Sequence, residues 1–410
     1  MKNISLRLAW RNLWRYKRRT WLTVGAMIFS NSLLVFSISL QFGSYDMMID
    51  NTLQAFSGHL QVQRVGYLDE QKMRYTLDDA IATAQQLRSE LDLPSIAARA
   101  TGFAIASSNE RTYGLQILGV EPDFEPMVST IPGLVKQGRY LKRDNGEEIV
   151  IGSLLARNLK VDTGDEITFL GSGLDNSFAA GVVKVVGIFE TGIPELDRST
   201  AQINLRYFQD SFAMQKKGHS VVIRARHIDD VETLQARIQA LLAQRNQLDI
   251  VHWDRLQPGL KQAIQADMTS AWFMYIVLIV LVAFSVLNTQ LMSVLERTRE
   301  FGVMMALGLK PGKMARLVMT ETTLMASLGL ALGILVGFVI TWYLSRVGFS
   351  YPGMEEMGAK FNLPDRMYPS ISVLSLLLGP GIVSAGSIIA AIYPALRLYA
   401  MLPIEAMRAA

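Results

Sequence analysis

The chain has 410 residues, of which half are apolar and only 19% are charged, and its formal net charge is +4. Its apolar content and positive mean hydropathy exceed those of an ordinary soluble protein with two domains, so part of the chain is expected to lie in lipid. The absence of cysteine excludes disulfide bonds and thiolate metal sites. The four histidines lack the spacing of metal ligands, and neither a metal nor another cofactor is expected in this chain.

A basic segment, residues 1–19, precedes the first apolar run. Arg7, Arg11 and Arg15 recur four residues apart, which places them on one face of a helix, and Trp14 lies on another face. Basic side chains contact anionic lipid headgroups, and tryptophan prefers the boundary of the bilayer. These residues therefore predict a cytoplasmic helix at the membrane interface. The alternative is a basic flank that only holds this end of the chain in the cytoplasm.

Residues 20–45 contain no Asp, Glu, Lys or Arg and are predicted to form the first transmembrane helix. About 20 helical residues cross a bilayer core, because backbone polar groups in lipid must be satisfied within the helix. A cleaved signal peptide is the alternative, but its apolar region is about 7–15 residues long. The longer run favours an uncleaved anchor.

Residues 46–267 mix helix and strand patterns and predict an extracytoplasmic α+β domain. Turn signals with glycine and asparagine separate short segments rich in β-branched and aromatic residues. Strands are expected at residues 59–65, 103–106, 115–120, 148–151, 166–170, 182–189 and 220–224. Apolar residues spaced three and four apart predict helices at residues 77–91 and 231–244. No recognisable motif places a nucleophile beside a base, so the chain is not expected to be an enzyme.

A second uncharged run, residues 268–295, predicts the second transmembrane helix, and residues 296–321 link it to the third. Gly308 can end a helix and Pro311 prevents its continuation, so a short helix is predicted from about residue 296 to residue 307. Its apolar side chains are expected to be available for docking a partner: Phe301, Met304, Met305 and Leu307. Residues 308–314 superficially resemble a phosphate-binding loop but lack its spacing and its Ser or Thr. ATP hydrolysis is therefore expected in another chain.

Two further runs contain no Asp, Glu, Lys or Arg: residues 322–345 and residues 367–396. They predict the third and fourth transmembrane helices. Residues 346–366 form the short extracytoplasmic loop between them, and residues 397–410 form a tail. Gly329, Gly333 and Gly337 leave one stripe of the third helix without side chains, which lets another helix approach closely. Packing within the same subunit is favoured over self-association.

The distribution of Lys and Arg beside the four runs predicts the orientation of the chain. Basic residues resist translocation, and they are concentrated before the first run and in the link after the second. Both termini are therefore expected in the cytoplasm. The segment 46–267 has 23 Lys and Arg against 29 Asp and Glu, so the basic excess of the whole chain comes from the residues outside it. This excess therefore indicates the orientation of the chain in the membrane. A nucleic-acid partner is not expected.

Several segments together resemble a known family. Residues 286–302 (VLNTQLMSVLERTREFG), continued by Ala306-Leu307-Gly308 and Glu321, are similar to the core of MacB/LolCDE-type ABC transporter permeases in the FtsX-like superfamily. The C-terminal segments 393–397 (YPALR) and 403–408 (PIEAMR) are similar to the ending of these permeases. Residues 9–15 (AWRNLWR), and the segment from 138 to 165, are weaker matches. The resemblance covers nearly the whole chain.

The resemblance implies a dimer of permeases in the bacterial inner membrane, each docking an ABC ATPase that binds ATP and Mg²⁺. The outer domain would be a two-lobed MacB-like periplasmic core, and its rearrangement would be driven from the cytoplasm by mechanotransmission. The segment from Arg297 to Gly308 would be the coupling helix, and its docking residues would be Arg297, Arg299, Glu300, Phe301, Met304, Met305, Leu307 and Gly308.

One departure from MacB narrows the resemblance. MacB carries its ATPase before the first span, whereas only 19 residues precede it here, which makes the layout closer to that of the lipoprotein-release permeases LolC and LolE. Lipoproteins or other amphiphiles would then be the cargo, and a periplasmic chaperone or acceptor would receive it. The alternatives are a drug or peptide exporter and an FtsX-like transmembrane signal transducer.

Overall fold

A computed structural model describes residues 2–15, 17–108, 111–143, 146–350, 352–354 and 366–400. The chain forms two compact units. The first, called here the span unit, comprises Met1–Tyr45, Ala263–Tyr351 and Arg366–Ala410. The second, called here the head unit, comprises Asp46–Gln262 and Pro352–Asp365.

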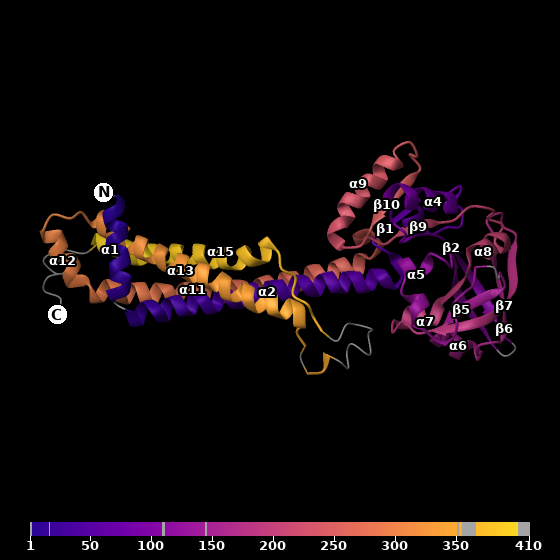
Figure 1. The fold of residues 1–410 in the computed structure, drawn as a ribbon, viewed down its shortest axis with the longest axis horizontal. Helices are drawn as coiled ribbons and strands as arrows, with labels where there is room; N and C mark the ends of the chain where they lie inside the picture. The colour runs from indigo at the N-terminus through magenta and orange to yellow at the C-terminus, as the bar shows by residue number, and fades with distance from the viewer. Residues whose placement is uncertain are drawn as a thin grey trace. The chain divides into compact units, whose positions relative to one another are not determined.

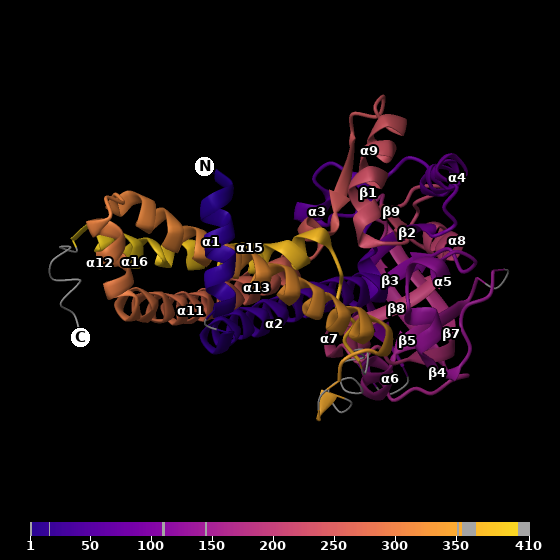
Figure 2. The same ribbon diagram turned by 60° about the vertical axis from the view of Figure 1, so that its left-hand side comes forward.

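The span unit is built from long helices. Within the described residues, four segments are long and apolar enough to cross a membrane: Thr20–Ser57, Pro258–Glu296, Pro311–Val347 and Val373–Arg397. They correspond to helices α2 (Lys17–Thr52), α11 (Pro258–Glu296) and α13 (Pro311–Val347), and to α15 (Val373–Ala390) with α16 (Ile392–Arg397). Figures 1 and 2 show α11, α13 and α15 side by side, with α1 (Lys2–Arg15) lying across them.

Helices α2, α11 and α13 are longer than the apolar runs that predict them, whereas the fourth segment, Val373–Arg397, is shorter than the predicted run of residues 367–396. Helix α11 begins ten residues before the predicted second span, and α13 begins inside the predicted link. Backbone hydrogen bonds of a helix continue past the hydrocarbon boundary as long as the local sequence permits it. Lys310 precedes α13 as its N-cap, and Pro311 occupies the first turn, where a missing amide hydrogen costs nothing.

The glycine stripe of α13 lies against α2 of the same chain. A β-carbon added to Gly329, Gly333 or Gly337 would come within 2.5 to 2.8 Å of a β-carbon of α2, on Met27, Asn31 and Val35 respectively. Asn31 Nδ2 donates to the Gly329 carbonyl at 3.1 Å, and Ser32 Oγ donates to the Gly333 carbonyl at the same distance. Close backbone approach and interhelical hydrogen bonds therefore join these two helices where no hydrophobic effect acts between them.

The head unit contains one ten-stranded sheet, in which six strands close a ring. Going round it, β2 pairs with β3, β3 with β8, β8 with β5, β5 with β7, β7 with β6, and β6 with β2. The remaining strands extend from this ring as β2-β9-β1-β10 on one side and as β7-β4 on the other. The strands are β1 (Leu60–Arg64), β2 (Ile96–Ser107), β3 (Thr112–Val120), β4 (Val135–Gly138), β5 (Glu148–Gly152), β6 (Glu166–Ser172), β7 (Phe178–Phe189), β8 (Thr200–Asn204), β9 (Ser220–Ile223) and β10 (Leu248–His252).

Strand β2 belongs to both parts of the head unit. Its first residues pair with β9, and its last residues pair with β6. In Figure 1, α4 (Ala80–Leu91) and α9 (Val231–Leu241) lie beside β1, β9 and β10, whereas β5, β6 and β7 lie on the other side of the head unit. The two lobes implied by the resemblance therefore share a strand. The shorter helices are α3 (Tyr67–Glu70), α5 (Glu125–Val128), α6 (Ser153–Leu159), α7 (Pro194–Ser199), α8 (Leu205–Ser211) and α10 (Trp253–Leu256).

The predicted strands and both predicted helices are confirmed, but β4, β8 and β10 were not predicted. Strand β8 has the sequence TAQIN, whose polar residues suggest a loop, yet all five residues are buried. Gln202 can be buried there because its side chain accepts a hydrogen bond from Tyr140 Oη at 2.7 Å. This partner comes from a segment about sixty residues earlier, so the local sequence does not reveal it.

A buried ion pair holds the end of a π-helical turn, Leu53–Ser57, which continues α2 into the head unit. Arg99 and Glu125 are both almost fully buried, with Arg99 Nη2 and Glu125 Oε1 2.6 Å apart. Arg99 Nη1 also donates to the Phe56 carbonyl. Other donors from the head unit reach the neighbouring carbonyls, namely Thr130 N to Gln54, Ser129 Oγ to Ala55 and Gln61 Nε2 to Ser57. These contacts satisfy the carbonyls that a helix end leaves open.

His219 is buried in the head unit as a neutral side chain. Its Nδ1 accepts a hydrogen bond from the Thr101 amide at 2.9 Å, its Nε2 lies 3.2 Å from the Met73 carbonyl, and its ring stacks on Tyr67. Burial lowers the pKa of His219 from 6.5 to about 4. The unfolded chain therefore binds more protons between these values, and the head unit loses stability as the pH falls from about 6.5 to about 4.

We predict that His219→Gln flattens this pH dependence, because glutamine can retain a donor and an acceptor but does not titrate. The unmutated head unit should lose about 3 kcal/mol of unfolding free energy across the window. Thermal unfolding of the full chain in detergent would be followed with a cysteine introduced at buried Ala225. Exposed His227→Gln is the control and should keep the original slope. Equal slopes for His219→Gln and the unmutated chain would contradict the assignment.

Candidate functional site

Helix α12 (Thr298–Ala306) is a short helix. The non-helical backbone of Arg297 separates it from the end of α11. Its end is a Schellman motif: the Gly308 amide donates to the Met305 carbonyl at 2.9 Å, and the Leu309 amide donates to the Met304 carbonyl at 3.0 Å. Gly308 has a φ of +90°, which a residue without a β-carbon adopts without strain. The predicted short helix is thus present, and Gly308 closes it as expected.

The base of α12 is fixed by a buried charge cluster. Arg297 Nη1 lies 3.1 Å from both carboxylate oxygens of Glu321 on α13, and the two side chains are about 95% buried. Arg297 Nε donates to Glu300 at 3.2 Å. Because both charged groups are buried away from water, each one depends on the other for its stabilisation.

Helix α1 joins the same cluster. Asn12 Nδ2 donates to Glu321 Oε1 at 2.7 Å, and Arg15 Nη1 lies 3.4 Å from Glu300 Oε1. Leu13 is buried against α2 and α13, beside Val24 and Met325. The cluster therefore connects the first helix, the junction of α11 with α12, and the start of α13 within one unit.

Phe301 is fully buried in the chain, so the expectation that its side chain is available for docking is wrong for this conformation. It packs in a cluster with residues of α11, α13 and the segment after α15, namely Val294, Met314, Ala315, Val318, Ala395 and Leu398. The Arg297 guanidinium also lies 5.0 Å from the centre of its ring. Phe301 faces inward because the Arg297 break fixes the rotation of α12 on the bundle. Its position makes it a support for α12.

The other predicted docking residues are distributed around α12. Leu307 is 77% exposed at the end of the helix, and Arg299 and Gly308 are also exposed. Met304 and Met305 are half-buried against the Phe301 cluster, and Glu300 is half-buried near Arg297. Arg297 itself is buried and offers no surface. The exposed part of the site is therefore narrower than the sequence indicates.

The residues predicted at the membrane interface lie on α1. Arg7, Arg11, Trp14 and Arg15 are exposed on this helix. Trp14 makes an edge-to-face contact with Trp10, with ring centres 5.7 Å apart. Exposed aromatic and basic side chains on one helix match the composition of segments that lie in a bilayer interface.

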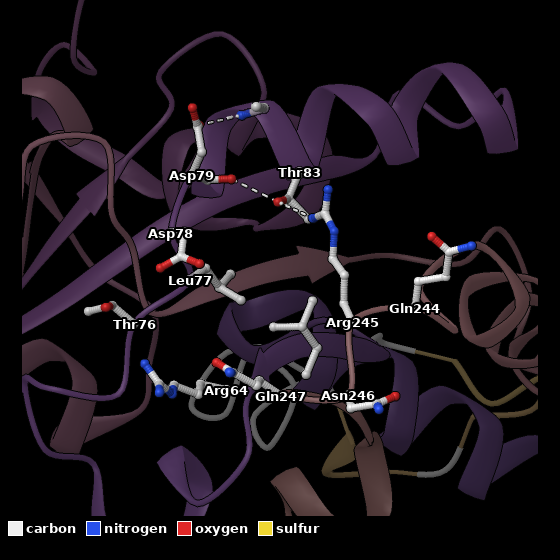
Figure 3. A pocket seen from close by; sticks show the side chains of 12 residues that line it. Arg64, Thr76, Leu77, Asp78, Asp79, Thr83, Gln244, Arg245, Asn246 and Gln247 are labelled. Carbon is white, nitrogen blue, oxygen red and sulfur yellow. Dashed lines mark hydrogen bonds between the residues drawn. The ribbon is translucent and has the colours of Figure 1, made fainter.

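A polar cleft of about 550 Å³ lies on the head unit. Figure 3 shows the charged side chains that line it, which are Arg64, Asp78, Asp79 and Arg245. Arg245 points toward Thr83, and Asp79 lies at the start of α4. Arg245 donates to Thr83 Oγ1 at 3.2 Å, and Asp79 accepts a hydrogen bond from the Ala82 amide as the N-cap of α4. Asp79 and Arg245 therefore have structural partners, and none of the predicted site residues lies in this cleft.

Asn12 and Glu321 lie in segments that resemble the family, but the sequence alone assigns neither of them a role. A signal for Glu321 was available, because it is the last acidic residue before a long apolar run. A carboxylate at the edge of a membrane span usually has a specific partner. The identity of that partner was not available, since Asn12 and Glu321 are 309 residues apart.

Comparison with known proteins finds two family matches. The FtsX-like permease C-terminal family matches residues 272–402, and the MacB-like periplasmic core domain family matches residues 20–241. Among curated proteins, the lipoprotein-releasing system transmembrane protein LolC of Xylella fastidiosa is 25% identical over 73% of this chain and 74% of its own length. LolC of Neisseria meningitidis is 23% identical over 74% of this chain and 75% of its own length.

A second group of relatives is longer than this chain. The macrolide export ATP-binding/permease protein MacB of Escherichia coli O157:H7 is 23% identical over 85% of this chain but only 55% of its own length. Among solved structures, the periplasmic region of MacB from Actinobacillus actinomycetemcomitans covers 50% of this chain and 92% of that chain, with 12% identity and a TM-score of 0.36.

We predict that Glu321→Ala destabilises the span unit by about 3–5 kcal/mol, because it leaves Arg297 charged and buried without its main partner. The double variant Arg297→Met with Glu321→Leu should recover most of this loss. Unfolding of the span unit would be followed through a cysteine introduced at buried Ser387, since the chain has no other thiol.

The control for this prediction is Asp249→Asn, which removes the acid from the more exposed pair of Asp249 with Arg255. A change within about 0.5 kcal/mol is expected there. If the double variant were as unstable as Glu321→Ala, the loss would arise from packing, and the charge assignment would be wrong.

Proposed function

We propose that this chain is the membrane subunit of an ATP-driven transporter that moves lipoproteins or other amphiphiles by mechanotransmission. The chain belongs to the FtsX-like permease family and carries the MacB-like periplasmic core domain. The observation that carries the proposal is the geometry of α12. A short helix with an exposed apolar end is fixed on the spans by the buried Arg297 cluster. Such a helix can receive force from a partner without being deformed.

The family relationship makes the chain a bacterial inner-membrane protein with a periplasmic domain. We propose further that both termini and α12 lie in the cytoplasm. The concentration of Lys and Arg before α2 and around α12 supports this orientation. In this orientation the head unit and α12 lie on opposite sides of the membrane.

The partner proposed for α12 is a separate ABC ATPase subunit that binds ATP and Mg²⁺. Leu307 would enter an apolar site on this subunit, with Arg299 at its rim, because exposed apolar residues at the centre of an interface contribute most to affinity. The buried residues Arg297 and Phe301 would keep α12 in place while the ATPase moves. A second permease, identical or paralogous, would complete the transporter.

The cargo is proposed from the relatives. LolC carries lipoprotein release in its name, and the match covers about three quarters of its length. The match to MacB, which is named for macrolide export, covers 55% of its length. Export of an amphiphilic drug or peptide is the alternative cargo, and an FtsX-like signal transducer is the alternative class. A periplasmic chaperone or acceptor would take the cargo from the head unit.

We predict that Leu307→Asp reduces recovery of the ATPase with the tagged chain about tenfold or more, because it places a charge in the proposed apolar contact. The measurement is copurification in mild detergent from the native membrane. Leu241→Asp, at an exposed leucine of α9 in the head unit, is the matched control and should leave recovery unchanged. Equal recovery of the ATPase with both variants would remove α12 as its docking helix.

The copurified complex also separates the function classes. Addition of a purified lipoprotein should stimulate ATP turnover by the complex if the cargo proposal is right. Copurification of a cell-wall hydrolase or its activator, with no response to lipoprotein, would favour the signal transducer.

We predict that a membrane-impermeant maleimide labels Glu195→Cys in cells with a permeabilised outer membrane but labels Lys310→Cys only after lysis. Both positions are exposed, and the chain has no other cysteine. Glu195 lies in the head unit, and Lys310 lies between α12 and α13. Labelling of both positions in the same compartment would overturn the proposed orientation and with it the force-transmission mechanism.

A further inference from the structure

A wide surface groove of about 670 Å³, called here the cavity, lies in the span unit where α2 begins and α11 ends. Its basic wall contains Arg15, the last residue of α1, and Lys17 and Arg18, the first residues of α2. Its opposite wall comes from the last turns of α11, and contains Asn288, Thr289, Met292 and Glu296. The volume is within the range of about 300–1,000 Å³ that is common for sites of small ligands.

The charge of the cavity wall favours an anion. Three basic side chains accompany a single carboxylate, that of Glu296. Arg15 contacts Glu300 at 3.4 Å but remains 65% exposed. In the described part of the chain no carboxylate pairs with Lys17 or Arg18. Two or three positive groups are thus positioned to contact one ligand, and guanidinium and ammonium groups are the usual partners of phosphate.

The apolar part of the cavity lies beside the basic part. Leu22 of α2 is 70% exposed and Met292 of α11 is 53% exposed, and both line the cavity. This is the end of two segments long enough to cross the membrane, where the headgroup region meets the hydrocarbon core. A ligand at this depth has an anionic group at the helix ends and an apolar chain along the helices.

We propose that this cavity binds one anionic phospholipid, with its phosphate at Lys17 and Arg18 and its first acyl carbons against Leu22 and Met292. Asn288 also lines the cavity, one helical turn further from the end of α11 than Met292. A lipid with an ethanolamine or choline headgroup would add a cation to an already basic wall, so the cavity should select phosphatidylglycerol. In the proposed orientation this lipid belongs to the cytoplasmic leaflet.

The test is native mass spectrometry of the full chain after delipidation in detergent, titrated separately with phosphatidylglycerol, phosphatidylethanolamine and phosphatidylcholine. One tightly bound phosphatidylglycerol is expected. Lys17→Gln with Arg18→Gln should weaken its binding about tenfold or more, at roughly 1 kcal/mol for each basic residue. Met292→Trp, which fills the apolar part without changing charge, should also weaken it.

The matched control is Arg7→Gln with Arg11→Gln, which removes two exposed charges from α1 outside the cavity. Equal weakening by both pairs would show general attraction of lipid to a basic surface and overturn the site. Displacement of the lipid by millimolar inorganic phosphate would mean a site for a soluble anion. Loss of dimer instead of lipid in Lys17→Gln with Arg18→Gln would mean that a second copy covers the cavity. None of these outcomes depends on whether an ATPase copurifies.

Discussion

Arg297 and Glu321 lie in contact and almost fully buried where α1, α11, α12 and α13 meet. Neither charge can separate from the other without an unpaired ion remaining in a medium of low polarity, which makes the joint resistant to small displacements. The ion pair therefore fixes the start of α12, the inward orientation of the Phe301 side chain, and the exposed position of Leu307. The proposed transmission of force depends on this rigidity.

The head unit uses the same chemistry at another helix end. Arg99, paired with Glu125, donates to a carbonyl of the π-helical turn that continues α2. Along the spans, by contrast, the α13 glycines contact α2 through close backbone approach and through hydrogen bonds of uncharged side chains, those of Asn31 and Ser32. A guanidinium can bridge a carboxylate and a backbone carbonyl at once, so it is suited to fixing the end of a helix whose sides lie in lipid.

The sequence predicts the spans, most strands and the short helix well, because hydrocarbon length, β-rich runs and Gly308 are local signals. The strand β8 and the burial of Phe301 are not local. Gln202 needs Tyr140, and the orientation of Phe301 follows from Arg297, whose partner Glu321 lies 24 residues further along. The sequence pattern indicates that α12 has apolar residues on one face. In the structure, some of these residues pack on the same chain, as Phe301 does, and Leu307 at the end of the helix is exposed.

The ring of six strands in the head unit has a consequence for behaviour before assembly. In the described part of the head unit, the strands at the two ends of the sheet are β10, which has five residues, and β4, which has four and pairs with an irregular register. The first residues of β3 and β7 also have a strand partner on one side alone. Long free edges invite strand addition by other chains. A domain whose end strands are this short offers little edge to other chains in a crowded compartment, which disfavours the seeding of fibrillar aggregates.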